Sequence, residues 1–251
     1  MANTLIQKYL FHVPATTGTP RVYSYNFKSD ELHKYLTGIA CPLVSASLPT
    51  ADSILIELRD DYRSILSFSP AQNWIKDTTS TDFDLTEVFR PLMATSAGKN
   101  FYINVKVTNS ATPFDFIVLF RQDNELQPLS VFGKSIEAYD MQSFTIPAPV
   151  IGTDYNFNLP SDFNYVAGVN IVGGDPATFN NILLEVNDSV RNLLDPMPLS
   201  CLKVRETVKY NNSFFPVSFI SKNKEVNIRL STVGTVSYTA TPITVTFLLT
   251  R

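Results

Sequence analysis

The sequence predicts an all-β protein built of two tandem eight-stranded antiparallel jelly rolls with short helices between strands. Three observations predict this fold class. A long segment occurs twice, short stretches alternate apolar with polar residues, and the 16 prolines of the 251-residue chain lie between those stretches. Alternation is the period of a half-buried strand, and proline belongs in turns and at strand starts.

The clearest repeat pairs ILIELRDDYRSIL (54–66) with ILLEVNDSVRNLL (182–194). The two segments align without a gap, and most of their non-identical pairs exchange one apolar residue for another. The identical pairs are Ile54/Ile182, Leu55/Leu183, Glu57/Glu185, Asp60/Asp188, Arg63/Arg191 and Leu66/Leu194.

Four further pairs of segments occur in the same order in the two halves of the chain. We align YSYNFKSD (23–30) with YNFNLPSD (155–162), FRPL (89–92) with FFPV (214–217), FYINVKV (101–107) with VNIRL (226–230), and TPFDFIVLF (112–120) with TPITVTFLL (241–249). The first of these alignments places Tyr23 opposite Tyr155, Ser29 opposite Ser161 and Asp30 opposite Asp162. Five matches in one order at a nearly constant offset indicate a duplicated domain.

The alternation of apolar and polar residues identifies individual strands. From Phe101 to Thr108, every odd position is apolar and the even positions are mostly polar. The same period occurs at 226–230, 23–27 and 243–247. It predicts half-buried strands in both copies.

Helical signals are few and short. The segments Asp61–Phe68 and Ser80–Phe89 have room for one or two turns each, with Asp82 or Asp84 as a possible cap. The acidic stretch at 81–89 is explained more simply as such a helix start than as a cation site. An immunoglobulin-like sandwich is the competing fold, although the Cys-Trp-Cys pattern of true immunoglobulin domains is absent.

The duplication sets the expected domain boundaries. In chain order we expect an N-terminal arm (1–20), a first jelly roll (21–125), a connector containing one strand (126–146) and a second jelly roll (147–251). The connector is not rich in Gly and Ser, so we expect the two jelly rolls to be fixed against each other.

The composition limits the possible functions. Charged residues make up 17% of the chain, below the roughly 25% of ordinary soluble proteins. This predicts either a surface that faces other protein or one rich in Ser, Thr and Asn. The net charge of −3 and the absence of a basic run argue against nucleic-acid binding. No run of apolar residues is long enough for a membrane-spanning helix, and the first residues lack the features of a signal peptide. We therefore expect synthesis in a cytoplasm.

The search for chemistry is mostly negative, and we expect no catalytic residue, no cofactor and no metal site. His12 and His33 lie far in sequence from any carboxylate cluster and are expected to be solvated or packed. Gly168, Gly173 and Gly174 lack the lysine and the following helix of a phosphate-binding loop, so a turn is the simpler interpretation. The two cysteines, Cys41 and Cys201, are expected to be buried free thiols.

The repeated Asp-x-x-Arg is the most prominent polar feature of the sequence. Asp60/Arg63 and Asp188/Arg191 follow Glu57 and Glu185, each of which is expected on a strand. They are either two copies of a ligand or sugar site, or a local ion pair at the same corner of each barrel. We favour the corner, because a duplicated fold duplicates its corners whether or not they bind anything.

These features together resemble the double jelly-roll major capsid proteins of tailless icosahedral viruses, with membrane-containing bacteriophages nearest in size. The resemblance covers about residues 20 to 251. It rests on the duplication, the strand rhythm and a helix-bearing insertion in each half, RSILSFSPAQNWIKDTTSTDFDLTEVF (63–89) and RNLLDPMPLSCLKVRETVKYNNSFF (191–215). No invariant motif of that family exists to be matched.

The resemblance implies a structural virion protein and no enzyme. The implied assembly is a homotrimer with a pseudo-hexagonal outline, which contacts neighbouring capsomers and minor capsid proteins to form an icosahedral capsid. It also implies a contact with an internal membrane through the arm or the barrel base, and no sequence-specific nucleic-acid binding. The alternatives are a tandem carbohydrate-binding or lectin module and a minor vertex or spike protein.

Overall fold

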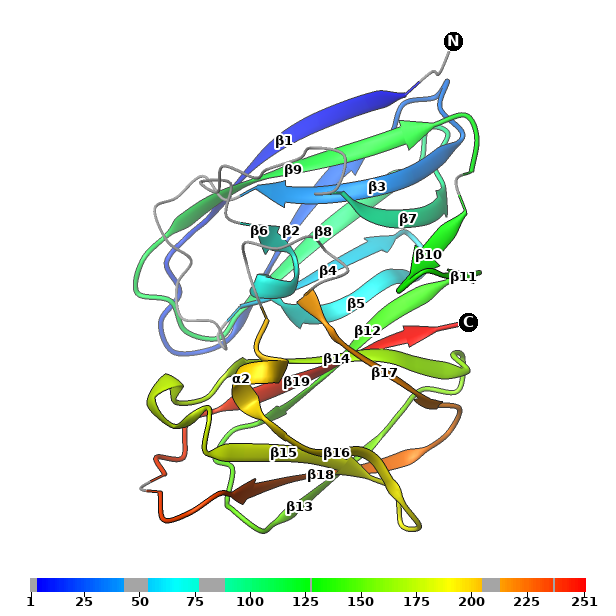
Figure 1. Cartoon of the computed structure of the whole chain (residues 1–251). Helices are drawn as coiled ribbons and strands as arrows, with labels where there is room; N and C mark the ends of the chain where they lie inside the picture. The colour runs from blue at the N-terminus through cyan, green and yellow to red at the C-terminus, as the bar shows by residue number, and fades with distance from the viewer. Residues whose placement is uncertain (1–3, 43–53, 77–88, 127, 205–212, 237) are drawn as a thin grey trace, which may run out of the picture. The chain divides into compact units, whose positions relative to one another are not determined.

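The computed structural model describes residues 4–42, 54–76, 89–126, 128–204, 213–236 and 238–251 (Figure 1). Within these residues the chain divides between Ala138 and Tyr139 into two compact units. Nearly all regular structure is β-strand, as the sequence predicts.

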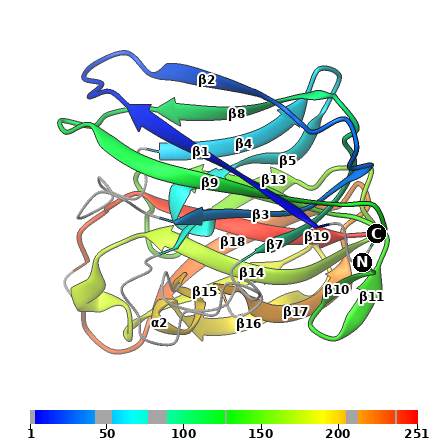
Figure 2. The same ribbon diagram turned by 90° about the horizontal axis from the view of Figure 1, so that it is seen from above.

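The first unit contains two large sheets that share no strand, and the separate two-stranded sheet β10-β11. Its elements are β1 (Leu5–Val13), β2 (Arg21–Lys28), β3 (Tyr35–Pro42), β4 (Ile54–Asp60), β5 (Ser64–Pro70), η2 (Ala71–Asn73), β6 (Ile75–Lys76), β7 (Arg90–Thr95), β8 (Asn100–Val107), β9 (Phe114–Asp123), β10 (Leu129–Val131) and β11 (Lys134–Ile136). One sheet has the order β1-β9-β3-β7, with β6 also paired to β3. The other has the order β2-β8-β4-β5, which Figure 2 shows from above.

This strand order is that of a jelly roll. With the two-residue β6 and the hairpin β10–β11 left aside, the strands counted along unit 1 form one sheet of order 1-8-3-6 and one of order 2-7-4-5. The first strand therefore pairs with the last, and the chain crosses repeatedly between the sheets, as two Greek keys require.

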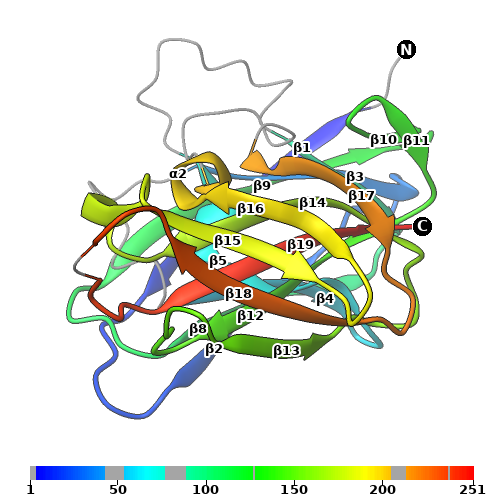
Figure 3. The same cartoon turned by 60° about the horizontal axis from the view of Figure 1, so that its bottom comes forward.

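The second unit repeats the arrangement. Its elements are β12 (Tyr139–Ile146), β13 (Asp154–Asn158), β14 (Tyr165–Gly173), η3 (Pro176–Thr178), β15 (Ile182–Asn187), β16 (Asn192–Pro198), α2 (Leu199–Leu202), β17 (Phe215–Ile220), β18 (Glu225–Thr232) and β19 (Ile243–Thr250). The sheets are β12-β19-β14-β17 and β13-β18-β15-β16, the second of which is shown in Figure 3. Counted from the first strand, both orders are those of unit 1.

Two of the expected domain boundaries are corrected by the sheet pairing. Residues 5–13, expected in an arm, form β1 and pair along their whole length with β9. Residues 139–146, expected in the connector, form β12 and pair with β19. The alternation in β1 is obscured in sequence because Gln7 points inward while Ile6 and Leu10 point outward.

The repeat from which the duplication was inferred occupies equivalent places in the two units. Leu58 pairs with Leu66 across β4 and β5, and Val186 pairs with Leu194 across β15 and β16. Both hairpins are interrupted by irregularities at matching positions. The match extends beyond the aligned segment to Pro70 and Pro198, which directly precede η2 and α2.

Two of the sequence alignments are wrong by two residues. Tyr25 pairs with Ile103, and Tyr155 pairs with Ile228, so the counterpart of Tyr155 is Tyr25 and not Tyr23. Phe120 and Phe247 are likewise counterparts, although the aligned segments had placed Phe120 opposite Leu249. A shift of two residues preserves the side that each strand buries, so alternation alone cannot detect it.

A further repeat was missed in the sequence. The segments YLTGI (35–39) and YVAGV (165–169) begin β3 and β14, and each contains a register shift just before its glycine. At Gly38 an added Cβ would lie 3.1 Å from the ring of Phe89. The glycine therefore allows close packing at an irregular point of the strand.

The helix expected over Asp61–Phe68 is wrong, because Ser64–Pro70 is the strand β5. The irregular pairing between β4 and β5 breaks the two-residue period there, and apolar residues then recur as they would on a helix. The second expected helix, over Ser80–Phe89, lies outside the described residues except for Phe89. The short helices η2 and α2 do occur within the two expected insertions.

Matching aromatic triads occupy the two cores. In unit 1, Phe27 and Phe120 stack with ring centroids 3.7 Å apart, and Tyr9 lies 5.4 Å from Phe27. In unit 2 the counterparts are Phe157, Phe247 and Phe144, with Phe144 lying 4.4 Å from Phe157 and 6.1 Å from Phe247. Each triad joins the two sheets of its unit.

Candidate functional site

Three connections meet at one end of the sheet β2-β8-β4-β5, because Lys28 pairs with Asn100 and Asp60 pairs with Phe101. In unit 2, Asn158 pairs with Glu225 at the corresponding end. We call this end the loop pole of each unit. The loop poles comprise residues 29–34, 60–63 and 96–99 in unit 1, and 159–164, 188–191 and 221–224 in unit 2.

The repeated aspartate of the Asp-x-x-Arg motif closes a hairpin turn at each loop pole. The Asp60 carboxylate accepts hydrogen bonds from the amides of Tyr62 (2.9 Å) and Arg63 (2.8 Å). Asp188 accepts from the amides of Val190 (2.9 Å) and Arg191 (2.8 Å) in the same way. The repeated motif therefore fixes a corner of the backbone, as the favoured interpretation expects, but it does so through amides that donate to the aspartate. The expected ion pair of aspartate and arginine is seen in unit 2, where Arg191 Nε lies 3.8 Å from Asp188 Oδ2.

Unit 2 adds charges to its corner. Lys224 Nζ lies 2.5 Å from Asp188 Oδ2, and Arg191 Nε lies 3.8 Å from the same oxygen. The lysine and the two amides together lower the pKa of Asp188 to about 2. In unit 1, Lys99 instead donates to the hydroxyl of Thr95. The two corners therefore have the same backbone hydrogen bonds but differ in their charged contacts.

We expect the Asp188 corner to make unit 2 sensitive to acid. Because the folded-state pKa is lowered, the ionised carboxylate stabilises the folded state above the unfolded pKa of about 3.9. This contribution is lost as the pH falls from about 4 to about 2. In Asp188→Asn, the loss of unfolding free energy relative to wild type should therefore be largest above about pH 4 and should shrink at lower pH. Denaturant unfolding over this pH range measures the difference.

The matched variant is Lys224→Met, which removes the partner and keeps the carboxylate. The loss of unfolding free energy in Lys224→Met relative to wild type should likewise shrink at low pH. A loss of unfolding free energy that does not change with pH in either variant would contradict the stabilising role of the ionised Asp188 carboxylate.

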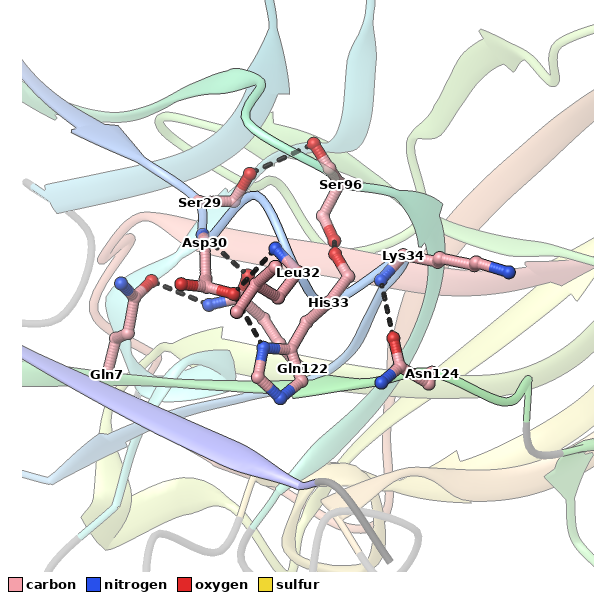
Figure 4. A network of polar contacts seen from close by, with 9 residues as sticks. All are labelled: Gln7, Ser29, Asp30, Leu32, His33, Lys34, Ser96, Gln122 and Asn124. Atoms are coloured by element: carbon pink, nitrogen blue, oxygen red, sulfur yellow. Dashed lines mark hydrogen bonds and ion pairs between the residues drawn. The ribbon is translucent and has the colours of Figure 1, made fainter.

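A larger polar network braces the loop pole of unit 1 (Figure 4). Asp30 Oδ1 accepts from the amide of Leu32 (2.8 Å) and lies 2.7 Å from His33 Nδ1. The His33 hydrogen bond is the main cause that lowers the pKa of Asp30. The Asp30 amide donates to Gln122 Oε1 (3.0 Å), and Gln122 Nε2 donates to Gln7 Oε1 (2.6 Å). The network connects the loop to β9 and β1. The His33 side chain is only 15% exposed, so of the two expected states, solvated or packed, it is packed.

A serine closes the same turn in both units. Ser96 Oγ donates to the carbonyl of His33 (2.9 Å), and Ser221 Oγ donates to the carbonyl of Phe163 (2.9 Å). The sequence signal is Ser-x-x-Lys, at SAGK (96–99) and SKNK (221–224). A search for paired turns, in addition to paired strands, would have found it.

The other polar residues noted in the sequence lie on the strands. Glu57 on β4 accepts a hydrogen bond from Asn104 (2.8 Å), and Glu185 on β15 lies 4.0 Å from Arg229. His12 Nδ1 lies 2.7 Å from Asp115 across β1 and β9. Neither glutamate is brought to the aspartate corner, so the motif and its preceding glutamate do not form one site.

Of the three glycines noted in the sequence, Gly173 and Gly174 form a turn, as expected, whereas Gly168 lies inside β14 next to its register shift. Gly173 and Gly174 end β14 with positive φ, and the Gly174 amide donates to the carbonyl of Pro242 (2.9 Å). Asp175 then accepts from the amide of Ala177 and opens the three-residue η3. This short 3-10 turn does not present the start of a long helix to a phosphate.

The two cysteines are both free but differ in burial. Cys41 is buried, and this burial raises the pKa of its thiol to about 12. Cys201 on α2 is exposed, so the expected burial is confirmed for Cys41 and wrong for Cys201. Among the described residues, no cluster of three His, Cys, Asp or Glu could hold a metal ion, and no helix there is long and apolar enough to cross a membrane.

The two complete sets of eight strands define a double jelly roll of the all-β class. No protein-family model matches the sequence, and no curated protein matches it. The chain is similar to a chain in the atomic structure of Sulfolobus Turreted Icosahedral Virus, with 7% identity, a TM-score of 0.48, and coverage of 98% of this chain and 90% of that chain.

Two other solved structures are similar. The major capsid protein P2 from bacteriophage PM2 has 9% identity and a TM-score of 0.41, with 98% of each chain covered. The quasi-atomic model of the PBCV-1 virus capsid has 9% identity and a TM-score of 0.45, with 100% of this chain and 94% of that chain covered. The jelly-roll assignment itself rests on strand order and register.

Proposed function

We propose that this chain is a structural virion protein, a capsid subunit that self-assembles as a trimer and tiles an icosahedral shell. The observation that carries the proposal is the presence of two jelly rolls with the same strand order in one chain. Identical chains close into rings of whole subunits. Three copies of a chain with two similar units present six similar units, and six suit a nearly hexagonal tile.

The composition supports extensive subunit contacts. Charged residues make up only 17% of the chain, and interface cores are depleted in Lys, Glu and Asp. The proposed partners are further copies of the chain, neighbouring capsomers and minor capsid proteins, and the proposed location is the virion. Residues 5–13 of the expected arm are paired with β9 as strand β1. A contact with an internal membrane would therefore involve the base of the jelly rolls and not these residues.

A carbohydrate-binding module is the second candidate from the sequence, and the position of the tryptophan disfavours it. Sugar binders stack their ligands on exposed aromatic rings. Trp74 is buried, and its Nε1 donates to the hydroxyl of Ser69 (2.7 Å). The single tryptophan is thus part of the core of unit 1 and is not a binding platform.

The experiment that tests the proposal is native mass spectrometry of the purified chain. We expect a particle of three times the 28.0 kDa chain mass, or larger shells built of such particles. A stable monomer that binds glycans on an array would contradict the proposal and favour the carbohydrate-binding module. A stable monomer without glycan binding would contradict both.

A further inference from the structure

Each unit turns one side of a four-stranded sheet outward, away from its core. In unit 1 this sheet is β2-β8-β4-β5 and in unit 2 it is β13-β18-β15-β16, and their strands alternate buried with more exposed residues. We call the outward sides the outer face of unit 1 and the outer face of unit 2. Because Tyr25 and Tyr155 are counterparts, the two outer faces can be compared position by position.

The outer face of unit 1 has an excess of positive charge. Its charged residues are three bases and one acid, a formal charge of +2, namely Lys28, Glu57, Arg59 and Lys106. Lys28 Nζ lies 2.9 Å from Glu31 Oε1 of the following loop. Among the described residues, no ion pair includes Arg59 or Lys106, so the excess lies at these two residues.

The outer face of unit 2 has the opposite excess. Its charged residues are three acids and one base, a formal charge of −2, namely Asp154, Glu185, Glu225 and Arg229. Arg229 Nε lies 3.9 Å from Asp154 Oδ1 and 4.0 Å from Glu185 Oε1, so one arginine faces two carboxylates. Glu225 is exposed and is in no ion pair of the described part of the chain.

The fold does not require these charges, because the other unit has neutral residues at the same places. The register makes Asn187 the counterpart of Arg59 and Ser231 the counterpart of Lys106. Single charges on a solvated surface add little to stability. The opposite signs therefore call for an explanation outside either jelly roll.

The excess charges have the same spacing on the two faces. Arg59 lies opposite Tyr102, which is four residues along β8 from Lys106. Asp154 and Glu185 lie on either side of Arg229, which is four residues along β18 from Glu225. Four residues of a strand span about 13 Å, so two positive points on one face match two negative points on the other.

We propose that the outer face of unit 1 in one copy of the chain binds the outer face of unit 2 in a second copy. Arg59 and Lys106 of the first copy then face the carboxylates of the second. The inference rests on the proposed function, because it names the surfaces through which the copies of a self-assembling subunit meet.

Charge complementarity selects a second copy as the partner, because both halves of the match lie in one chain. Two identical faces would repel each other, whereas unlike faces attract. The contact is therefore heterologous, which is the type that joins identical subunits into a ring. A formal charge of +2 on one face is too small for a nucleic-acid partner in a chain with a pI of about 5.4.

The test is sedimentation velocity of purified full-length variants over a range of protein concentrations. The first variant combines Arg59→Glu and Lys106→Glu, and the second combines Asp154→Lys and Glu225→Lys. The third combines all four substitutions, which exchanges the charges of the two faces. The control combines Lys8→Glu and Lys134→Glu, two exposed lysines on β1 and β11.

We expect the first and second variants each to need about tenfold more protein for half-assembly, because attraction across the contact becomes repulsion. The third variant and the control should assemble as wild type does. The losses should largely disappear in about 1 M salt, where the Debye length is about 3 Å. Circular dichroism checks folding, and Arg59→Gln with Lys106→Gln replaces a first variant that does not fold, with a smaller loss expected.

Four results would overturn the inference. Folded first and second variants that assemble as wild type does would refute the two faces and leave the proposed capsid function standing. Equal losses in the control would show that only the net charge of the chain matters. A folded third variant that does not recover would refute the pairing of one face with the other. A wild-type chain that stays monomeric would refute the proposed function itself.

Discussion

Replacing one phenylalanine of either aromatic triad with alanine is expected to unfold that unit preferentially. Phe120→Ala and Phe247→Ala each remove a fully buried ring from the aromatic triad in the core of its unit. Loss of a buried phenylalanine costs about 3–5 kcal/mol, because a cavity remains where the ring was. Since the two rings are counterparts, we expect similar losses in the two variants.

Native-state hydrogen exchange measures these losses separately for the two units. Phe120→Ala should raise exchange in β8 and β9, and Phe247→Ala should raise it in β18 and β19. Tyr62→Ala is the control, since its side chain is 91% exposed and should change stability by no more than about 0.5 kcal/mol. A variant that left its own unit unchanged would contradict the assignment of the two rings as equivalent core residues.

The second large effect is expected at the turn that ends β14. Gly173 has a φ of +87°, and an added Cβ would lie 2.3 Å from the carbonyl oxygen of Pro242. Gly173→Ala therefore combines an unfavourable backbone conformation with a clash against backbone that cannot rotate away. We expect unit 2 to lose about 3 kcal/mol, measured by hydrogen exchange in β14 and β19.

Gly152→Ala separates the two contributions to this loss. Gly152 has a φ of +81°, and nothing lies within 4 Å of an added Cβ there. The variant should lose only the conformational part, about 1 kcal/mol. Equal losses at the two glycines would show that the contact with Pro242 does not matter.

The architecture could be predicted from the sequence because duplication and strand alternation are both local patterns. Alternation alone reveals Phe101, Ile103 and Val105 as one buried row. The register could not be predicted to the residue, because a shift by two positions leaves the same residues buried. Only the pairing of Tyr25 with Ile103 and of Tyr155 with Ile228 fixes it.

Strands with mixed faces could not be recognised from sequence. In β1, Gln7 turns inward to bond Gln122, while Ile6 and Leu10 stay exposed, so the strand resembled a free arm. In β5, irregular pairing disrupted the two-residue period and suggested a helix. In both cases a long-range contact decides the structure, and a single segment carries no signal of it.

The aspartate corners could be predicted from the sequence, but the exposed apolar residues two positions after each aspartate could not. Asp60 and Asp188 stand out because they repeat, whereas Tyr62 and Val190 differ in chemistry and share only their exposure. The corner containing Asp30 has no repeat in the second half, since Pro160 lies at its place. Because these exposed side chains share no residue type, the sequence alone does not pair them.

Negative-stain microscopy of the purified assembly tests the central claim most directly, namely that two equivalent jelly rolls in one chain allow three chains to form a six-part tile. Averaged end-on views should show six similar lobes related by threefold symmetry. Twofold particles, or three undivided lobes, would contradict it.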